Sequence, residues 1–434
     1  MSAGSSVCVI GLGKIGLPLA VQIASSGFRV VGFDVAEDVV KQTNAGVPPF
    51  PNEPNLGERL REVIDSGRFS ATTLPDESIS RADILIICTP LALKDGSTAP
   101  DYSILDQVAH TVGSFSKDEC LVILETTVPV GTTRTRLMPN IIKHRGVDGA
   151  RGLQVAFSPE RVSSGSVFRD LAAYPKLVGG VDKDSAESAA RFYGDALQFA
   201  PRDDLTRPNA VWTLESSEDA EMVKLCETTY RDVNIALANE FAKHCVDHGL
   251  DFGQIREAAN SQPFSYIHDA GVSVGGHCIP VYPHLYMEAD RKTELVPRAR
   301  EINNGMPEYA VETLERRVGS LKNALILIAG VAYRPLVRET ANSGAFDLAN
   351  ALESRGAKAY ALDPMFTDTE LQTLGFETLA DLSEVDHVIV HTYHPELKSW
   401  TPSDLPKCKT ILFGRKGDLF ALPGIQSYSL FEPA

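Results

Sequence analysis

The run from Gly275 to Pro280 reads Gly-Gly-His-Cys-Ile-Pro. Glycines let a backbone come close to a ligand, and a thiol at such a place is a candidate nucleophile. Two other interpretations stay open: a buried, inert cysteine, which composition alone favours, and a metal site built on His277 and Cys278. A zinc site needs further ligands at a suitable spacing, and the sequence has no second pair, so we expect no bound metal.

A second set of residues, Gly11, Gly13 and Gly16, has the spacing of a phosphate-binding turn. These glycines directly follow the apolar run Val7–Ile10, which predicts a buried strand, and they open a predicted helix, Leu17–Ser26. In this context the first glycine permits a tight turn, the second lets the backbone approach a pyrophosphate, and the third allows close helix packing. An ordinary tight turn between a strand and a helix is the alternative.

Asp34 closes the second predicted strand, Phe28–Phe33, and lies 23 residues after Gly11. This is near the roughly 20-residue offset at which dinucleotide-binding folds carry an acid for the ribose. A carboxylate there accepts hydrogen bonds from the ribose diol and repels a 2′-phosphate. The sequence therefore predicts NAD as the cofactor, in preference to NADP.

The elements that position these residues alternate between strands and helices. Apolar runs predict further buried strands at 84–88 and 121–124, which favours a parallel, doubly wound sheet in an N-terminal domain, residues 1–205. A second α/β domain, residues 319–434, begins with the predicted strand 324–330 and lacks the glycine fingerprint. Further strands are predicted at 358–362 and 388–390, with a helix at 344–354. The predicted fold class is α/β, with two Rossmann-like domains.

Residues 206–318 are expected to form a central helical domain that carries the Cys278 loop. Apolar side chains recur there at three- and four-residue steps, which predicts a long amphipathic helix from about Ser217 to Gly249. The helix would span about 45 Å and join the two Rossmann-like domains as a core element, and we expect it to contribute to a dimer contact. Its apolar stripe comprises Val223, Cys226, Tyr230, Val233, Leu237, Phe241 and Cys245.

The composition argues against several classes of protein. The 434 residues carry a net charge of −16 without a basic stripe, so we expect neither nucleic acid nor an anionic membrane as a partner, although a phosphorylated small molecule is compatible. No apolar run reaches the roughly 18 residues of a membrane span, and the first residues lack the features of a signal peptide. The 7 cysteines include no CxxC motif, which favours reduced thiols in the cytoplasm.

Several motifs in the right order make the chain resemble the UDP-glucose/GDP-mannose dehydrogenase family over nearly its full length. The Gly-Gly-His-Cys-Ile-Pro form most resembles the branch that oxidises UDP-N-acetylhexosamines. The matching runs are Gly11–Gly16, Cys88–Pro90, Glu125–Thr133, Ser158–Val162, Lys224–Glu240 and Gly275–Pro280.

The resemblance implies an NAD-dependent 6-dehydrogenase that oxidises the C6 alcohol of a nucleotide-diphosphate sugar twice, to a uronic acid. Cys278 matches the family nucleophile: an aldehyde is a poor hydride donor, whereas its thiohemiacetal is a good one and leaves a thioester that water cleaves. Lys224 matches a lysine that stabilises alkoxide and oxyanion charge. Glu160 matches a glutamate that moves a proton through water, and Thr127 matches a threonine that holds this water.

The resemblance also implies which residues bind the two ligands. Taken singly, Lys224 could instead lie on a solvated helix face, Glu160 could start a helix and Thr127 could belong to a turn. The expected NAD contacts are Gly11, Gly13, Lys14, Ile15, Gly16, Asp34, Thr89, Pro90 and Thr127. The expected substrate contacts are Glu160, Arg161, Lys224, Thr228, Gly275, Gly276 and Arg334.

Five positions depart from the family pattern. Thr228 stands where the family usually has an asparagine of the catalytic site, and Tyr282 where it usually has an aspartate. Phe264 and Ala341 stand in place of arginines, whereas Arg334 replaces a lysine and keeps its charge. These changes leave the sugar, and the choice between UDP and dTDP, open, and they suggest a specialised substrate.

Two other functions remain to be distinguished from this one. A one-step dehydrogenase of the β-hydroxyacid type would also pair a Rossmann domain with a catalytic lysine, but the cysteine loop and the second α/β domain count against it. A non-catalytic nucleotide-sugar-binding protein would explain Thr228 and Tyr282, but the retained Cys278 and Lys224 count against it. The number of NADH molecules released per sugar separates the three functions: two for the double oxidation, one for a one-step dehydrogenase and none for a binding protein. We also expect a homodimer or a higher homo-oligomer.

Overall fold

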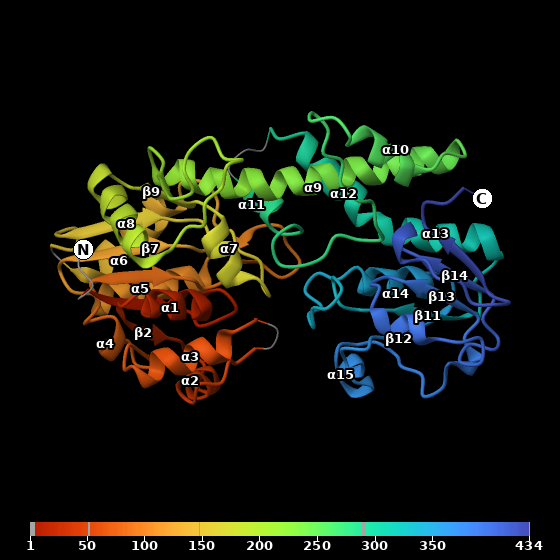
Figure 1. Ribbon diagram of the computed structural model, residues 1–434, viewed down its shortest axis with the longest axis horizontal. Coiled ribbons are helices and arrows are strands. Elements are labelled where there is room, and N and C mark those ends of the chain that lie inside the picture. The colour runs from red at the N-terminus through yellow and green to blue at the C-terminus, as the bar shows by residue number, and fades with distance from the viewer. Residues whose placement is uncertain (1–4, 51–52, 147, 289–291, 434) are drawn as a thin grey trace. The chain divides into compact units, whose positions relative to one another are not determined.

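The computed structural model describes residues 5–50, 53–146, 148–288 and 292–433, so the first four residues, which bear on the signal-peptide expectation, lie outside the described part. The chain divides into two compact units, residues 1–227 with 284–290 and residues 228–283 with 291–434. Each unit contains a mainly parallel sheet flanked by helices (Figure 1). The predicted α/β class with two Rossmann-like sheets is confirmed. The division into three domains at 205 and 318 stays a prediction.

The sheet of the first unit carries the glycine-rich turn. Among the described residues its strand order is β10-β9-β8-β7-β4-β1-β2-β3, and all neighbours are parallel except β8 and β9. The order reverses beside β1, which lies between β2 and β4. Sheets of this type bind their ligands beyond the carboxyl ends of the strands at such a switch point.

The strands of this sheet are β1 (Ser6–Ile10), β2 (Arg29–Phe33), β3 (Phe69–Thr72), β4 (Ile84–Ile87), β7 (Cys120–Leu124), β8 (Leu153–Phe157), β9 (Lys176–Gly180) and β10 (Val211–Thr213). A small hairpin consists of β5 (Ala92–Leu93) and β6 (Pro100–Asp101). The helices are α1 (Gly16–Ser25), α2 (Glu37–Asn44), α3 (Leu56–Asp65), α4 (Pro75–Ser78), α5 (Ser103–Phe115), α6 (Met138–Arg145), α7 (Val167–Ala173) and α8 (Lys183–Ala196), with a π-helical turn at Thr133–Leu137.

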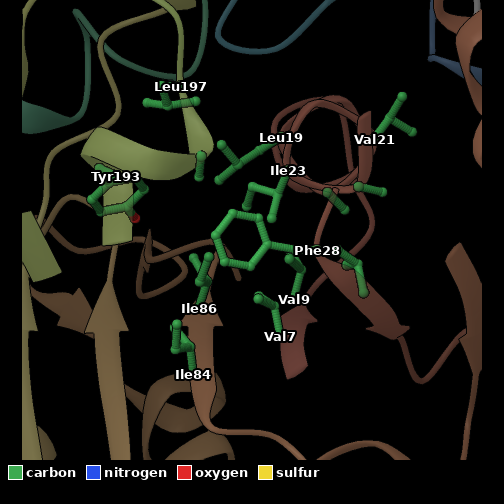
Figure 2. Packing of buried hydrophobic residues seen from close by; sticks show 14 of the residues in the cluster. Val7, Val9, Leu19, Val21, Ile23, Phe28, Ile84, Ile86, Tyr193 and Leu197 are labelled. Atoms are coloured by element: carbon green, nitrogen blue, oxygen red, sulfur yellow. The ribbon is translucent and has the colours of Figure 1, made fainter. Parts of the chain in front are cut away.

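The core of the first unit is built from the apolar runs that predicted its strands. All four residues of β4 are buried, as expected for a parallel strand covered on both faces. Figure 2 shows Phe28 among side chains of β1, β4 and α1, and its ring meets that of Phe192 at 5.5 Å between centroids. The packing holds the carboxyl ends of β1 and β4 in a fixed position beside the turn.

The sheet of the second unit has the order β12-β11-β13-β14-β15 in the described residues, and every neighbouring pair is parallel. The predicted strands at 324–330, 358–362 and 388–390 are present. The strands are β11 (Leu325–Ala329), β12 (Lys358–Leu362), β13 (His387–Val390), β14 (Thr410–Phe413) and β15 (Gln426–Ser429). The helices are α10 (Phe252–Ala259), α12 (Leu295–Asn304), α13 (Met306–Val318), α14 (Ala345–Ser354) and α15 (Asp368–Thr373).

One long helix, α9 (Ser217–Asp247), contributes residues to both units and agrees with the helix predicted over 217–249. The helix packs in the core as expected, but mainly through another face than the predicted apolar stripe. Of that stripe, Cys245 is buried, whereas Tyr230, Leu237 and Phe241 are 54%, 43% and 42% exposed. Small and hydrogen-bonding side chains form the buried face instead. They include Ala220, Glu221, Leu225, Thr228, Asp232, Ala236, Asn239 and Ala242. No helix in the described ranges has the length and apolar character needed to cross a membrane.

Candidate functional site

The turn after β1 has the geometry of a pyrophosphate cradle. Gly11 has a φ of 93°, and its N–H donates to the Phe33 carbonyl at 2.8 Å. A Cβ on Gly16 would lie 1.9 Å from the Gly11 carbonyl oxygen, so no side chain fits there. A Cβ on Gly13 would meet nothing within 4 Å, which leaves open space beside the turn. The residues therefore fit a dinucleotide.

Gly13→Ala and Gly16→Ala should separate cofactor binding from folding. Because the space at Gly13 is open, Gly13→Ala should keep its melting temperature but weaken NAD⁺ binding about tenfold, since the methyl group occupies room next to the pyrophosphate. Gly16→Ala forces the turn and α1 apart and should lower both stability and binding. Calorimetry and thermal unfolding measure the two effects. Unchanged NAD⁺ affinity in Gly13→Ala would contradict this role of the turn.

Asp34 follows β2 directly and is hydrogen-bonded to the glycine-rich turn. Its Oδ2 accepts a hydrogen bond from the Leu12 N–H at 2.8 Å, and its Oδ1 accepts one from the Ala36 N–H at 2.9 Å. An ionised carboxylate has about four acceptor positions, so these bonds leave capacity for a ribose diol. Lys14 and Ile15 are half-buried within the turn.

The other expected cofactor residues lie at the carboxyl ends of β4 and β7. A Cβ on Gly11 would be 3.3 Å from the Cγ2 atom of Thr89, so the two segments are in contact. The Thr126 hydroxyl donates to the Thr89 carbonyl at 2.6 Å, which places buried Thr127 beside them, whereas Pro90 is exposed. The NAD contacts expected from the sequence are thus brought to one edge of the sheet.

Glu160 lies in a buried cluster of charged residues at the same edge. Phe157 pairs with Gly179 in the antiparallel β8–β9 ladder, and continuing this register places Glu160 opposite Lys176. The Lys176 Nζ atom is 2.9 Å from Oε2 of Glu160 and 2.7 Å from Oε1 of Glu125, which follows β7. One ammonium group is therefore shared by two carboxylates.

The two carboxylates of this cluster differ in their surroundings. Burial acts to raise the pKa of Glu160, but Lys176, the N–H groups of Arg161 and Val162, and Lys224 outweigh it, so this pKa lies below its usual range. Burial raises the pKa of Glu125 to about 7, although Lys176 opposes the shift. Burial likewise acts to lower the pKa of Lys176, but its two carboxylate partners outweigh it, so Lys176 stays charged.

Helix α9 brings Lys224 to Glu160. The Lys224 ammonium donates to the Glu160 main-chain carbonyl at 2.6 Å, and one turn later Glu227 forms an ion pair with Arg161 at 2.6 Å. Three of the expected site residues, Glu160, Arg161 and Lys224, therefore lie together. Thr228 is buried on the same helix, four residues after Lys224.

Sequence reasoning missed several residues of this site. Glu125, like Asp34, directly follows a buried strand, and this position could have marked it. Lys176 and Tyr193, whose hydroxyl donates to Glu125, gave no comparable signal. Glu221, on α9, accepts hydrogen bonds from the Thr133 N–H at 2.8 Å and the Thr133 hydroxyl at 2.6 Å. Burial raises the pKa of Glu221 to about 7. Through these hydrogen bonds Glu221 connects the segment around Thr133, which follows Thr127, to the helix that contains Lys224.

The cysteine loop belongs to the second unit, and its thiol is exposed. This rules out the buried, inert cysteine. The glycines have a packing reason that the sequence did not reveal: a Cβ on Gly275 would lie 2.6 Å from the Cβ of Tyr333. Gly276 has a φ of 96°, and its N–H donates to the Ala341 carbonyl at 2.8 Å. The loop is therefore held against the segment that follows β11.

Further contacts fix the loop on both sides of Cys278. The Asn342 side-chain amide donates to the Gly276 carbonyl at 3.1 Å, and His277 contacts Glu339. The Tyr282 N–H donates to the Cys278 carbonyl at 2.8 Å as the chain enters α11 (Tyr282–Glu288). Arg334 lies beside the Tyr333 ring, and Phe264 is 95% exposed. Within the described ranges, no three His, Cys, Asp or Glu side chains gather as metal ligands would.

Comparison with known proteins decides which family this architecture represents. Residues 5–197 match the NAD binding domain of the UDP-glucose/GDP-mannose dehydrogenase family, residues 218–305 its central domain and residues 327–414 its UDP binding domain. The chain belongs to this family. It is an NAD-dependent nucleotide-sugar dehydrogenase, as the sequence predicted.

Individual relatives agree with this assignment. The chain is 36% identical over 423 residues to the UDP-N-acetyl-D-mannosamine dehydrogenase of Pyrococcus horikoshii, covering 94% of this chain and 95% of that one. It is 28% identical over 417 residues to the enzyme of that name from Escherichia coli, covering 91% and 94%. A solved structure of the Pyrococcus horikoshii UDP-D-ManNAc dehydrogenase superposes with a TM-score of 0.86 at 31% identity, covering 98% of this chain and 99% of that one.

Proposed function

We propose that this nucleotide-sugar dehydrogenase oxidises a C6 alcohol twice, to a uronic acid, through a thiohemiacetal and a thioester on Cys278. The observation that supports this proposal is the exposed thiol of Cys278. It lies on a loop whose glycines, Gly275 and Gly276, pack against Tyr333. A free Cys is usually buried, so an exposed thiol on a rigid loop favours a chemical role over packing.

The proposed reaction balances as one alcohol, two NAD⁺ and one water giving one carboxylate, two NADH and three protons. Bound NAD⁺ supplies the hydride acceptor for both oxidations. Cys278 adds as a thiolate to the aldehyde carbon, and after the second hydride leaves, its sulfur carries the acyl group. Water then forms the new C–O bond, and the C–S bond breaks to return the thiolate.

Residues of the first unit would stabilise the negative charge that develops in this reaction and would transfer its protons. The Lys224 ammonium, held by the Glu160 carbonyl, is suited to stabilise alkoxide and oxyanion charge. The Glu160 carboxylate is ionised and can take a proton from water, and buried Thr127 would hold that water. The Arg161–Glu227 pair orders the backbone around Glu160. Substrate contacts by Gly275, Gly276, Thr228 and Arg334 are part of the same proposal.

UDP-N-acetylhexosamines are the substrates that we propose first. The match to a UDP binding domain and the names of the relatives support UDP, and dTDP-hexoses serve as the alternative. The test is a nucleotide-sugar panel with NAD⁺, read as NADH absorbance and as product mass. Two NADH per sugar and a uronic acid are expected. One NADH would indicate a single oxidation, and none with any sugar would indicate a binding protein.

We also propose a homodimer that buries the exposed stripe of α9. Tyr230, Leu237 and Phe241 present apolar surface on one face of that helix. Phe241→Glu should convert the dimer to a monomer because it places a charge in this apolar contact. Glu240→Gln, at a neighbouring exposed residue, should leave the dimer intact. Light scattering measures both. A Phe241→Glu protein of unchanged mass would contradict this interface.

A further inference from the structure

The Glu125–Lys176–Glu160 cluster holds a net charge of −1 away from water when both carboxylates are ionised. Its side chains are 1%, 5% and 11% exposed, respectively. Burying a charge that is not fully compensated is costly, so such a cluster favours uptake of one proton. With one proton added, the cluster is neutral.

The surrounding groups decide which carboxylate takes this proton. Glu160 keeps its charge because two main-chain N–H groups and Lys176 donate to it, and Lys224 lies nearby. Glu125 has less support: Tyr193, from α8, and Lys176 both approach Oε1, whereas Oε2 is buried without a hydrogen-bond partner. The Cys88 thiol, at the end of β4, also faces Glu125 but brings no positive charge. The added proton therefore belongs on Glu125.

We propose that Glu125, Lys176 and Glu160 form a store for one proton, in which Lys176 is a positioning residue that keeps Glu160 ionised and relays to Glu125 the proton that Glu160 collects. This inference rests on the proposed function, because that reaction releases three protons. Because the store takes the proton from Glu160, Glu160 can act as a base again before that proton is released to solvent.

The relay needs two proton shifts and no change of electrons. An N–H proton of Lys176 moves to Glu125 across the 2.7 Å contact, and the proton on Glu160 moves to the Nζ atom across the 2.9 Å contact. The ammonium group is restored, and one proton has moved from Glu160 to Glu125. The reverse shifts return it to Glu160 for release.

The first test measures the store without any turnover. Carboxyl ¹³C NMR of protein labelled at glutamate should show a side chain that titrates near pH 7 and that is lost in Glu125→Gln. Glu221 should give a second such signal, which Glu221→Gln identifies. Tyr193→Phe removes a donor to ionised Glu125 and should move the first titration to higher pH. If neither variant alters a titration near neutral pH, the store is overturned.

The second test asks whether turnover uses the store. Wild-type kcat should rise as the pH passes through about 7, because only ionised Glu125 accepts the proton. Glu125→Gln should lack this rise and lose about tenfold in kcat at pH 8, with KM values unchanged. Tyr193→Phe should shift the rise to higher pH. Lys176→Arg should lose it, because a guanidinium group keeps the positive charge but does not pass on a proton.

The two tests separate the inference from the proposed function. Oxidation of a nucleotide sugar with wild-type pH profiles in both Glu125→Gln and Tyr193→Phe would overturn the relay and leave the function standing. A Glu125 titration in a protein that oxidises no nucleotide sugar would overturn the function, and with it the use of the store in that reaction.

Discussion

Cys278→Ser is expected to bind NAD⁺ and the sugar normally but to reduce uronic acid formation at least about 10³-fold, as loss of a nucleophile does in other covalent enzymes. The first oxidation needs only a base and a positioned acceptor. The second needs an adduct on residue 278, and a serine hydroxyl is a far weaker nucleophile at neutral pH than a thiolate and a far poorer leaving group. The protein should therefore stall after one hydride transfer or retain an ester.

Mass spectrometry of the protein and the product distinguishes these outcomes. Cys226→Ser is the matched control, because Cys226 is also an exposed thiol but lies on α9. It should produce uronic acid at the wild-type rate. Normal uronic acid formation by Cys278→Ser would remove the thioester from the mechanism.

Lys176→Met is expected to destabilise the fold by about 3–5 kcal/mol, because it leaves two buried carboxylates without their cation. The loss in the free energy of unfolding should be largest above pH 7 and should become smaller as the pH falls. At lower pH the remaining carboxylates take up protons, and the cost of burying their charge disappears. Urea unfolding at several pH values measures the free energy of unfolding directly.

Lys183→Met provides the comparison for this substitution. Lys183 pairs with Glu187 at 3.6 Å, but its side chain is 87% exposed, so solvent screens the interaction. The control should unfold at nearly the wild-type urea concentration at every pH. An equal effect of the two substitutions would show that the buried ammonium does not compensate Glu125 and Glu160.

The parts of the site that the sequence predicted are those that local patterns encode. Gly11, Gly13 and Gly16 follow an apolar strand and open a helix, and the structure shows a local steric reason for Gly11 and Gly16 and open space at Gly13. Asp34 is found at the end of β2 for the same reason. The long helix also follows from periodicity alone, with its end within two residues of the expected position.

The face that α9 buries could not be predicted in this way. Periodicity marks the most apolar stripe, but Glu221, Asp232 and Asn239 are buried instead, and each of them has a hydrogen-bond partner from a distant segment. A polar side chain is buried at low cost only where such partners exist. Whether they exist depends on segments far away in the sequence.

The sequence by itself determined the strand–turn–helix that cradles a dinucleotide, the order of the elements and the residue types able to carry out the chemistry. Only the tertiary structure decided which charges meet. Glu125, Glu160 and Lys176 come from three strand ends spread over about fifty residues, and the parallel β7–β8 and antiparallel β8–β9 pairings place them around one ammonium. Their surroundings in the fold then set the pKa of each carboxyl group. This pKa depends on the hydrogen-bond donors, charges and water around the group, and not on its neighbours in the chain.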